Sequence, residues 1–124
     1  MSTSRTRLGD AGERFVERQL TGRGWTILAR KWRGRSGEID LVADDGTLIV
    51  LVEVKTRRGE SHGRAEESVT PAKCARLIRL GQEYLEANIE LEERYWRVDL
   101  VAITLDSSGA IARYNHIEDV CLDE

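Results

Sequence analysis

Three charged residues, Asp40, Glu53 and Lys55, stand at the ends of segments that otherwise have the pattern of buried strands. The continuous apolar stretch Leu48–Val52 precedes Glu53 directly and is typical of a strand covered on both faces. A carboxylate or an ammonium group at the end of such a strand is costly unless it is paired or binds a metal. The placement of these charges therefore indicates a metal-dependent active site.

The turn between the two charged strands decides whether their side chains converge. Asp45-Gly46 between β-rich segments is a strong hairpin signal. An even-length loop centred on this pair would put Asp40 opposite Leu51. Alternation along the strands then predicts two opposite faces, one with Glu38, Asp40, Glu53 and Lys55 and the other with Ile39, Leu41, Val50, Val52 and Val54. An odd-length loop would turn one strand over and destroy the convergence.

In this register Asp40 and Glu53 are diagonal neighbours, roughly 7–8 Å apart at Cα, so both carboxylates can reach one cation. Mg²⁺ suits the pair because it takes hard oxygen ligands and keeps several waters. Beside a bound phosphodiester, Lys55 could position or deprotonate an attacking water, or stabilise the pentavalent transition state. The structural alternative is an exposed hairpin face with cross-strand salt bridges, which contribute little stability.

Helical and strand periodicities alternate along the chain and predict one α/β domain around a mixed sheet. The apolar pattern over 8–20 predicts a helix that ends near Gly22 and Gly24, and Thr70-Pro71 predicts the start of a second helix. The expected strands are 25–29, 38–43, 48–56, 96–104 and 110–114, with a basic loop over 30–37 and a polar loop over 57–68.

Length and composition are those of one soluble domain, spanning 1–124 with disorder expected over 1–7. No apolar run approaches the roughly 20 residues needed to cross a bilayer, and no secretory signal is visible at the start, so we expect a cytoplasmic protein with no membrane partner. Cys74 and Cys121 lack the spacing of a metal or redox motif. We interpret Cys74, on the apolar stripe of a helix, as a reduced core thiol.

Charge is distributed unevenly along the chain. Residues 1–80 contain 16 Lys and Arg against 11 Asp and Glu, whereas residues 81–124 contain 3 against 11, so the net charge of −3 divides into +5 and −8. A basic front half can attract phosphates. Charge counts alone are equally compatible with an ordinary solvated surface.

Four motifs in the same order carry a resemblance to a known family. They are Gly9-x-x-Gly12-Glu13, Gly37-Glu38-Ile39-Asp40-Leu41-Val42-Ala43, Val52-Glu53-Val54-Lys55-Thr56-Arg57 and Arg97-Val98-Asp99-Leu100-Val101-Ala102-Ile103. Together they resemble the YraN family of predicted endonucleases, within the PD-(D/E)XK superfamily and similar to Holliday-junction resolvases. The resemblance runs from about Gly9 to Ile117. It implies a restriction-endonuclease-like αβββαβ core and a Mg²⁺-dependent endonuclease, with Mn²⁺ as a substitute.

The same resemblance implies roles for individual residues. Asp40 and Glu53 would be metal ligands, together with the backbone carbonyl of Val54, and Lys55 the catalytic lysine. Glu13 would be a helix carboxylate near the metal and hence both ligand and catalytic group, although a solvated glutamate is the alternative. One position differs: Ile39 stands where the superfamily motif has proline, as is tolerated among resolvase-like members. Such relatives are often dimers, so a homodimer is one expected state.

Other residues are weaker candidates. Glu38 is either a ligand or a structural partner of Lys55, and a buried Asp99 is better explained by pairing with an arginine than by catalysis. We expect Arg33, Arg35, Arg57 and Arg58 to contact phosphates, since their loops border the proposed pocket. A solvated face fits Lys73, Arg76 and Arg79 at least as well, His62 and His116 have no zinc-ligand spacing, and the tryptophans Trp25, Trp32 and Trp96 belong to the core unless Trp32 stacks on a base.

Three functions are compatible with these patterns. The first is an endonuclease acting on DNA, including branched or damaged DNA. The second is a catalytically silent nucleic-acid-binding module with the nuclease fold, whose affinity would fall with salt and need no divalent metal. The third is a structural or interaction protein in which the charged residues form only a salt-bridge cluster.

Overall fold

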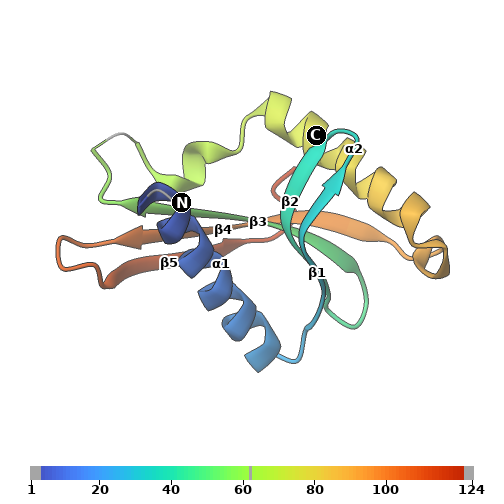
Figure 1. Cartoon of the computed structure of the whole chain (residues 1–124), viewed down its shortest axis with the longest axis horizontal. Coiled ribbons are helices and arrows are strands. Elements are labelled where there is room, and N and C mark those ends of the chain that lie inside the picture. The colour runs from blue at the N-terminus through green and yellow to red at the C-terminus, as the bar shows by residue number, and fades with distance from the viewer. Residues whose placement is uncertain (1–3, 62, 122–124) are drawn as a thin grey trace.

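The computed structural model describes residues 4–61 and 63–121, which fold into a five-stranded sheet with a helix on each face (Figure 1). The elements are α1 (Ser4–Gly22), β1 (Thr26–Gly34), β2 (Gly37–Asp44), β3 (Ile49–Arg58), the 3₁₀ turn η1 (Ala65–Ser68), α2 (Pro71–Ala87), the 3₁₀ turn η2 (Ile89–Leu91), β4 (Trp96–Leu105) and β5 (Ile111–Ile117). No helix within the described ranges is both long and apolar enough to cross a membrane.

The strands lie in their chain order, β1-β2-β3-β4-β5. β3 and β4 are parallel and joined through α2, while the other neighbours are antiparallel. This arrangement confirms the predicted mixed sheet and the αβββαβ element order. Figure 1 shows β1 and β2 turned steeply away from the direction of β3, β4 and β5, so the sheet is strongly twisted between β2 and β3.

Each helix covers its own hydrophobic cluster. On one face, Val16 and Leu20 of α1 pack with Leu41, Val50 and Val52. On the other face, buried side chains of α2 and the sheet meet in a second cluster, which contains Leu77, Leu80, Tyr84, Ile39, Val42 and Leu51. Asp40 and Glu53 therefore lie in a sheet that is packed on both faces.

The termini of both helices follow from local chemistry. α2 begins as predicted, with Pro71 at its first position and the Thr70 hydroxyl accepting the Lys73 backbone N–H at 3.2 Å. α1 ends at Gly22, as predicted, but it begins at Ser4. It thus includes four residues of the segment 1–7 for which disorder is expected, while residues 1–3 lie outside the described residues.

The basic segment 30–37 is not a loop, as the sequence suggested. β1 continues to Gly34, which faces Gly37 across a tight turn formed by Arg35 and Ser36. The Glu83 carboxylate on α2 accepts hydrogen bonds from both the backbone N–H and the hydroxyl of Ser36. This tertiary contact, which no local pattern reveals, ties the tip of the β1–β2 hairpin to α2.

The interpretation of Cys74 as a reduced thiol is wrong in this structure. Cys74 of α2 and Cys121, in the turn after β5, form a disulfide with their Cα atoms 5.4 Å apart. The two cysteines are 47 residues apart in the sequence, so only the tertiary fold brings them together.

Candidate metal-dependent active site

Asp40 and Glu53 come together on β2 and β3, but in a register two residues away from the predicted one. Asp44 faces Ile49 and Leu41 faces Val52; the pairing ends there, next to Asp40 and Glu53, whose carboxyl groups share a hydrogen bond. The carboxylate of Asp45 causes the difference, because it accepts the N–H groups of Thr47 and Leu48 and closes a four-residue loop. The shift is even, so it preserves the convergence and makes the two carboxylates direct rather than diagonal neighbours.

The sheet is irregular at this point. Ile39 packs with Val42 on the α2 side, whereas Leu41 packs on the α1 side, so strict alternation fails between Ile39 and Leu41. The prediction that Ile39 shares a face with Leu41 is therefore wrong. The facing strand β1 is also irregular at this level, because Lys31, between the pairs Arg30–Leu41 and Trp32–Ile39, has a positive φ of 48°.

Asp40 lies where β2 and β3 separate. The recorded pairing between the two strands ends at Leu41 and Val52. Beyond it, the Val54 backbone N–H donates to Asp40 Oδ2 at 2.8 Å, so a side chain takes the place of a ladder partner. This hydrogen bond fixes one carboxylate oxygen and orients the group toward Glu53.

The surroundings of Asp40 disfavour its negative charge. Burial, the charge of Glu53, a hydrogen bond with Glu53 and the charge of Glu13 together raise the pKa of Asp40 to about 8, against the lowering effect of the Val54 N–H. Two facing carboxylates without a cation between them repel each other in this way. A divalent cation would remove the repulsion.

Glu53 is almost fully buried and forms an ion pair with Lys73, whose role the sequence did not decide. Lys73 Nζ lies 2.6 Å from Glu53 Oε2, and the two side chains are 26% and 9% exposed. Lys73 belongs to the first turn of α2, so the helix delivers a positive charge directly to one of the candidate metal ligands. The solvated-face alternative for Lys73 is thereby excluded.

Glu13 approaches the pair from α1. Its side chain is 15% exposed and accepts from Lys31 Nζ at 3.1 Å, while Lys31 also contacts Asp10 at 3.0 Å. The pKa of Glu13 is raised overall, because burial and the charges of Asp10 and Glu38 outweigh the lowering effect of Lys31. Glu13 and Lys31 line a hollow of about 210 Å³ between α1 and β1. Glu13 is thus electrostatically linked to Asp40, but its direct partner is Lys31.

Lys55 follows Glu53 by two positions on β3, and its neighbour on β4 is Ala102. Residues i and i+2 of a strand point to the same face, so Lys55 shares the face of Glu53. It is half-buried there. Its catalytic role stays a prediction.

The oxygen donors suit a small, hard cation. Among the residues that the structure describes, no group of three His, Cys, Asp or Glu side chains is arranged to hold a metal ion. Mg²⁺, however, is commonly bound by one or two carboxylates and completes its octahedral shell with waters and substrate oxygens. Asp40 and Glu53 could supply such a pair of carboxylates.

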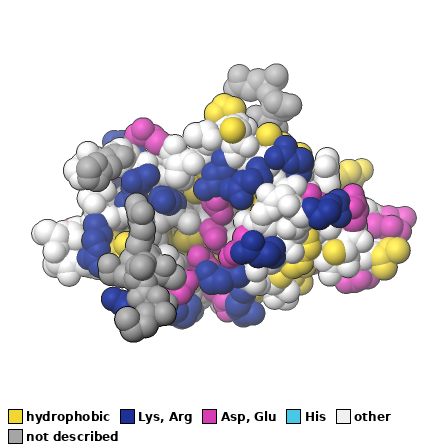
Figure 2. Space-filling model, turned by 45° about the horizontal axis from the view of Figure 1, so that its top comes forward, with side chains coloured by type: hydrophobic (Ala, Val, Ile, Leu, Met, Phe, Trp, Pro, Cys, Tyr) yellow, Lys and Arg dark blue, Asp and Glu magenta, His cyan; other side chains and the backbone are white. Residues whose placement is uncertain are grey.

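Two of the four arginines expected to contact phosphates are paired with acidic residues. Arg33 pairs with Glu38 at 2.9 Å and Arg35 with Glu86 at 3.6 Å, and both arginine side chains are largely exposed. Arg57 is half-buried with its Nε unsatisfied among the described atoms, and Arg58 is exposed. Figure 2 shows a face on which Lys and Arg side chains surround a smaller central group of acidic ones.

The partner of Glu38 is thus Arg33, and the charge of Glu38 also contributes to raising the pKa of Glu13. Trp32 packs edge to face against Tyr84 at a centroid distance of 5.2 Å. This contact makes Trp32 part of the α2 layer. It leaves a base-stacking role for Trp32 without structural support.

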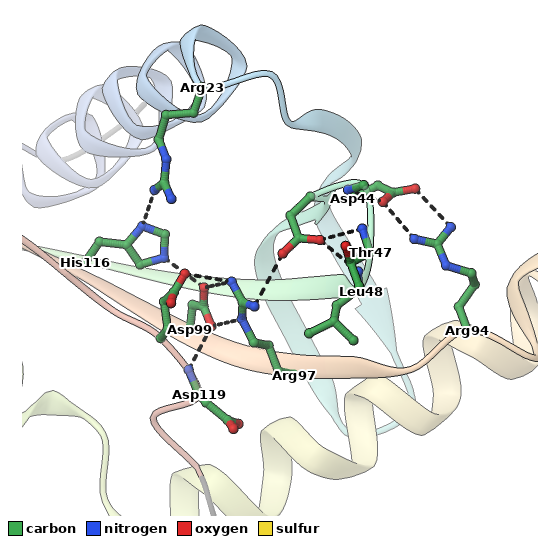
Figure 3. A network of polar contacts seen from close by, with 12 residues as sticks. Arg23, Asp44, Thr47, Leu48, Arg94, Arg97, Asp99, His116 and Asp119 are labelled. Atoms are coloured by element: carbon green, nitrogen blue, oxygen red, sulfur yellow. Dashed lines mark hydrogen bonds and ion pairs between the residues drawn. The ribbon is translucent and has the colours of Figure 1, made fainter.

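Asp99 is a structural residue, as its expected pairing with an arginine implies (Figure 3). It is fully buried and accepts from Arg97 Nε at 2.9 Å, His116 Nε2 at 2.8 Å and the Asp119 backbone N–H at 2.9 Å. Burial raises the pKa of Asp99, but these hydrogen bonds outweigh it and lower the pKa overall. His116 also contacts Arg23 through Nδ1 at 3.1 Å, whereas His62 lies outside the described residues.

Sequence reasoning missed two lysines of the site. A cation in the first turn of a helix opposes the helix dipole, so Lys73 could have been singled out from the sequence. Lys31 carries no such signal, because its contact with Glu13 depends on how α1 lies over β1.

Comparison with known proteins identifies relatives that extend over most of the chain. The model of the uncharacterised protein family UPF0102 matches residues 12–103. A UPF0102 protein of Roseiflexus castenholzii is 46% identical over 117 residues, which cover 94% of each chain. A UPF0102 protein of Kineococcus radiotolerans is 49% identical over 113 residues, covering 91% of this chain and 92% of the relative.

Proposed function

The chain belongs to the uncharacterised protein family UPF0102, and we propose that it is a Mg²⁺-dependent endonuclease that hydrolyses phosphodiester bonds of DNA. The observation that carries the proposal is the opposed pair Asp40 and Glu53 at the point where β2 and β3 separate. A strongly raised pKa caused by burial and a second carboxylate is typical of functional sites.

Asp40, Glu53 and the Val54 carbonyl would hold the cation. When bound, Mg²⁺ would neutralise charge on the phosphate and activate water for attack. The protein contributes the orientation of the ligands. Val54 fixes Asp40 through its N–H, and the packed layers on either side keep the facing strands in place.

Lys55 supplies the remaining charge. From its place beside Glu53, its ammonium group would contact the non-bridging oxygens of the phosphate and stabilise the negative charge that grows there during attack by water. Glu13 would act indirectly, through a bridging water and through its charge, because it is paired with Lys31. Arg33, Arg57 and Arg58 would bind the flanking backbone phosphates.

A cleavage assay tests the proposal. The protein would be incubated with plasmid, flap and four-way-junction DNA in Mg²⁺ or Mn²⁺. We expect cleavage that EDTA abolishes and that Asp40→Asn and Lys55→Met each reduce by at least about a hundredfold, the usual size of a general acid–base or electrostatic contribution. Cleavage that survives in both variants would show that a contaminant is responsible.

A catalytically silent nucleic-acid-binding module is the alternative, favoured by one observation. Lys73 already neutralises Glu53, so the site is partly balanced without a divalent ion. This alternative predicts binding that falls with salt, is unaffected by EDTA and occurs without cleavage of any of the three substrates.

A further inference from the structure

Lys73 is the feature of the site that the proposed mechanism does not use. Its ammonium group lies 2.6 Å from Glu53 Oε2, at the third helical position of α2. The Thr70 cap and Pro71 fix the start of this helix, and the Cys74–Cys121 disulfide anchors the next residue. The position of Lys73 is therefore well defined.

The stability of α2 does not explain a lysine at this position. The N-terminus of a helix carries a partial positive charge, so a cation there is unfavourable, whereas an acidic residue would be favourable. The first turn of α2 contains no acidic residue. Lys73 thus accepts an unfavourable interaction with its own helix in order to reach Glu53.

The contact also conflicts with the proposed role of Glu53. A ligand of Mg²⁺ must present its charge to the metal, and a divalent cation at about 2.1 Å interacts with it more strongly than an ammonium group does. A bound cation would therefore weaken the hold of Glu53 on Lys73. The released ammonium group would lie beside the site at which a phosphate meets the metal.

We propose that Lys73 is a substrate-positioning residue that pairs with Glu53 in the metal-free protein and, once a divalent cation takes Glu53, binds a phosphate of the nucleic-acid backbone. The inference rests on the proposed function, because it requires Glu53 to be a metal ligand. It makes Lys73 both an internal competitor of the metal and a metal-gated contact to the substrate.

The first arm of the test measures binding of Mn²⁺ alone by titration calorimetry. Lys73→Met removes the competitor, so we expect affinity to increase by on the order of fivefold, as for the loss of one partly exposed ion pair. Arg79→Met, which removes the same charge from an exposed position of α2, should leave the affinity unchanged. Equal affinities for wild type and Lys73→Met would overturn the proposal.

The second arm measures oligonucleotide binding by fluorescence anisotropy as a function of monovalent salt, with EDTA or with a fixed concentration of Ca²⁺. With Ca²⁺ we expect the slope of log affinity against log salt to be smaller by about one for Lys73→Met than for wild type, because one phosphate contact is lost. With EDTA the two slopes should agree. Lys73→Arg should restore the wild-type slope.

A purely structural ion pair gives a different result. Lys73→Met would then lower thermal stability but change neither slope, and this result would contradict the proposal. Failure of the underlying function is distinguishable, since wild-type protein would then show neither Mn²⁺ binding nor cleavage. If only the inference fails, wild-type protein would still bind Mn²⁺ and cleave DNA, but Lys73→Met would change neither the Mn²⁺ affinity nor the salt dependence of DNA binding.

Discussion

At Asp40, the requirements of folding and of metal binding oppose each other. A buried carboxylate facing a second one destabilises the metal-free fold, yet the same arrangement offers two negative charges to one cation. The charges of Lys31 and Lys73 moderate the cost at Glu13 and Glu53. The protonation of the site should therefore change with pH, and under the proposed function a divalent cation would change it as well.

The stability of the metal-free protein should fall as the pH rises from about 5 to 8.5. The folded state retains the Asp40 proton up to about pH 8, whereas the unfolded chain releases it near its ordinary value, so the folded state binds more protons in this window. Thermal denaturation in EDTA measures the effect, since each kcal/mol of stability shifts the melting temperature by on the order of 4 °C.

Asp40→Asn should lose this part of the pH dependence and should melt above wild type at pH 8.5 in EDTA. Added Mn²⁺ should raise the melting temperature of wild type but not that of the variant. Identical pH profiles for the two proteins would contradict the assignment of the raised pKa to Asp40.

At the scale of elements, α1 and the β2–β3 hairpin hold the site through unusually close contacts. A Cβ at Gly12 would collide with the Thr56 side chain and touch Val54, so α1 approaches β3 closely one residue before Glu13. At the opposite end of the hairpin, Arg97 links Asp45 of the turn to the buried Asp99 (Figure 3).

Gly12→Ala should destabilise the protein by about 1–3 kcal/mol, as overpacking does, and displace Glu13. Urea denaturation would measure the loss. Gly9→Ala is the matched control, because a Cβ there meets nothing within 4 Å and alanine is the better helix former. Adding Thr56→Ala to Gly12→Ala should recover part of the loss, and the absence of any coupling would refute the close contact.

Asp99→Asn should cost about 1.5–3 kcal/mol near neutral pH, because it removes the buried carboxylate charge that accepts hydrogen bonds from Arg97 and His116, although Arg97 keeps Asp45 and Glu118 as partners. The lowered pKa of Asp99 means that its contribution is present above about pH 4 and disappears as the pH falls below it. Glu118→Gln, which changes an exposed partner of the same arginine, should cost less than about 1 kcal/mol. Equal effects of the two substitutions in urea denaturation would contradict this assignment.

The parts of this arrangement that the sequence predicts are those set by local chemistry. The Thr70-Pro71 helix start and the mixed sheet are confirmed. The even length of the β2–β3 loop, as expected, lets Asp40 and Glu53 converge. The exact register was missed because the Asp45 carboxylate, rather than the Asp-Gly dipeptide alone, sets the loop. The Ile39 face, the ordered segment around Lys31 and the disulfide depend on contacts between distant elements, which periodicity does not contain.

At the scale of the whole molecule, the Cys74–Cys121 disulfide links α2 to the turn after β5. This link holds the end of the helix that carries Lys73, so it connects the rigidity of the fold to the site. It also joins the basic first part of the chain to the acidic last part.

Reduction of the Cys74–Cys121 disulfide should lower the free energy of unfolding by up to about 4 kcal/mol, the loop-closure value for a separation of 47 residues. Urea denaturation with and without dithiothreitol measures it, with the double variant Cys74→Ser and Cys121→Ser as a control that should not respond to the reductant. A wild-type transition that does not change on reduction would contradict a stabilising role.

The most direct test of the metal site is calorimetric titration of Mn²⁺ into wild-type protein and Asp40→Asn at the same pH. The variant keeps the shape of the side chain and is expected to fold at least as stably as wild type without metal. We predict binding to wild type that is weaker by at least about tenfold in Asp40→Asn, the effect of about 1.4 kcal/mol of lost ligation. Equal Mn²⁺ affinities, or no binding to either protein, would contradict a divalent cation between Asp40 and Glu53.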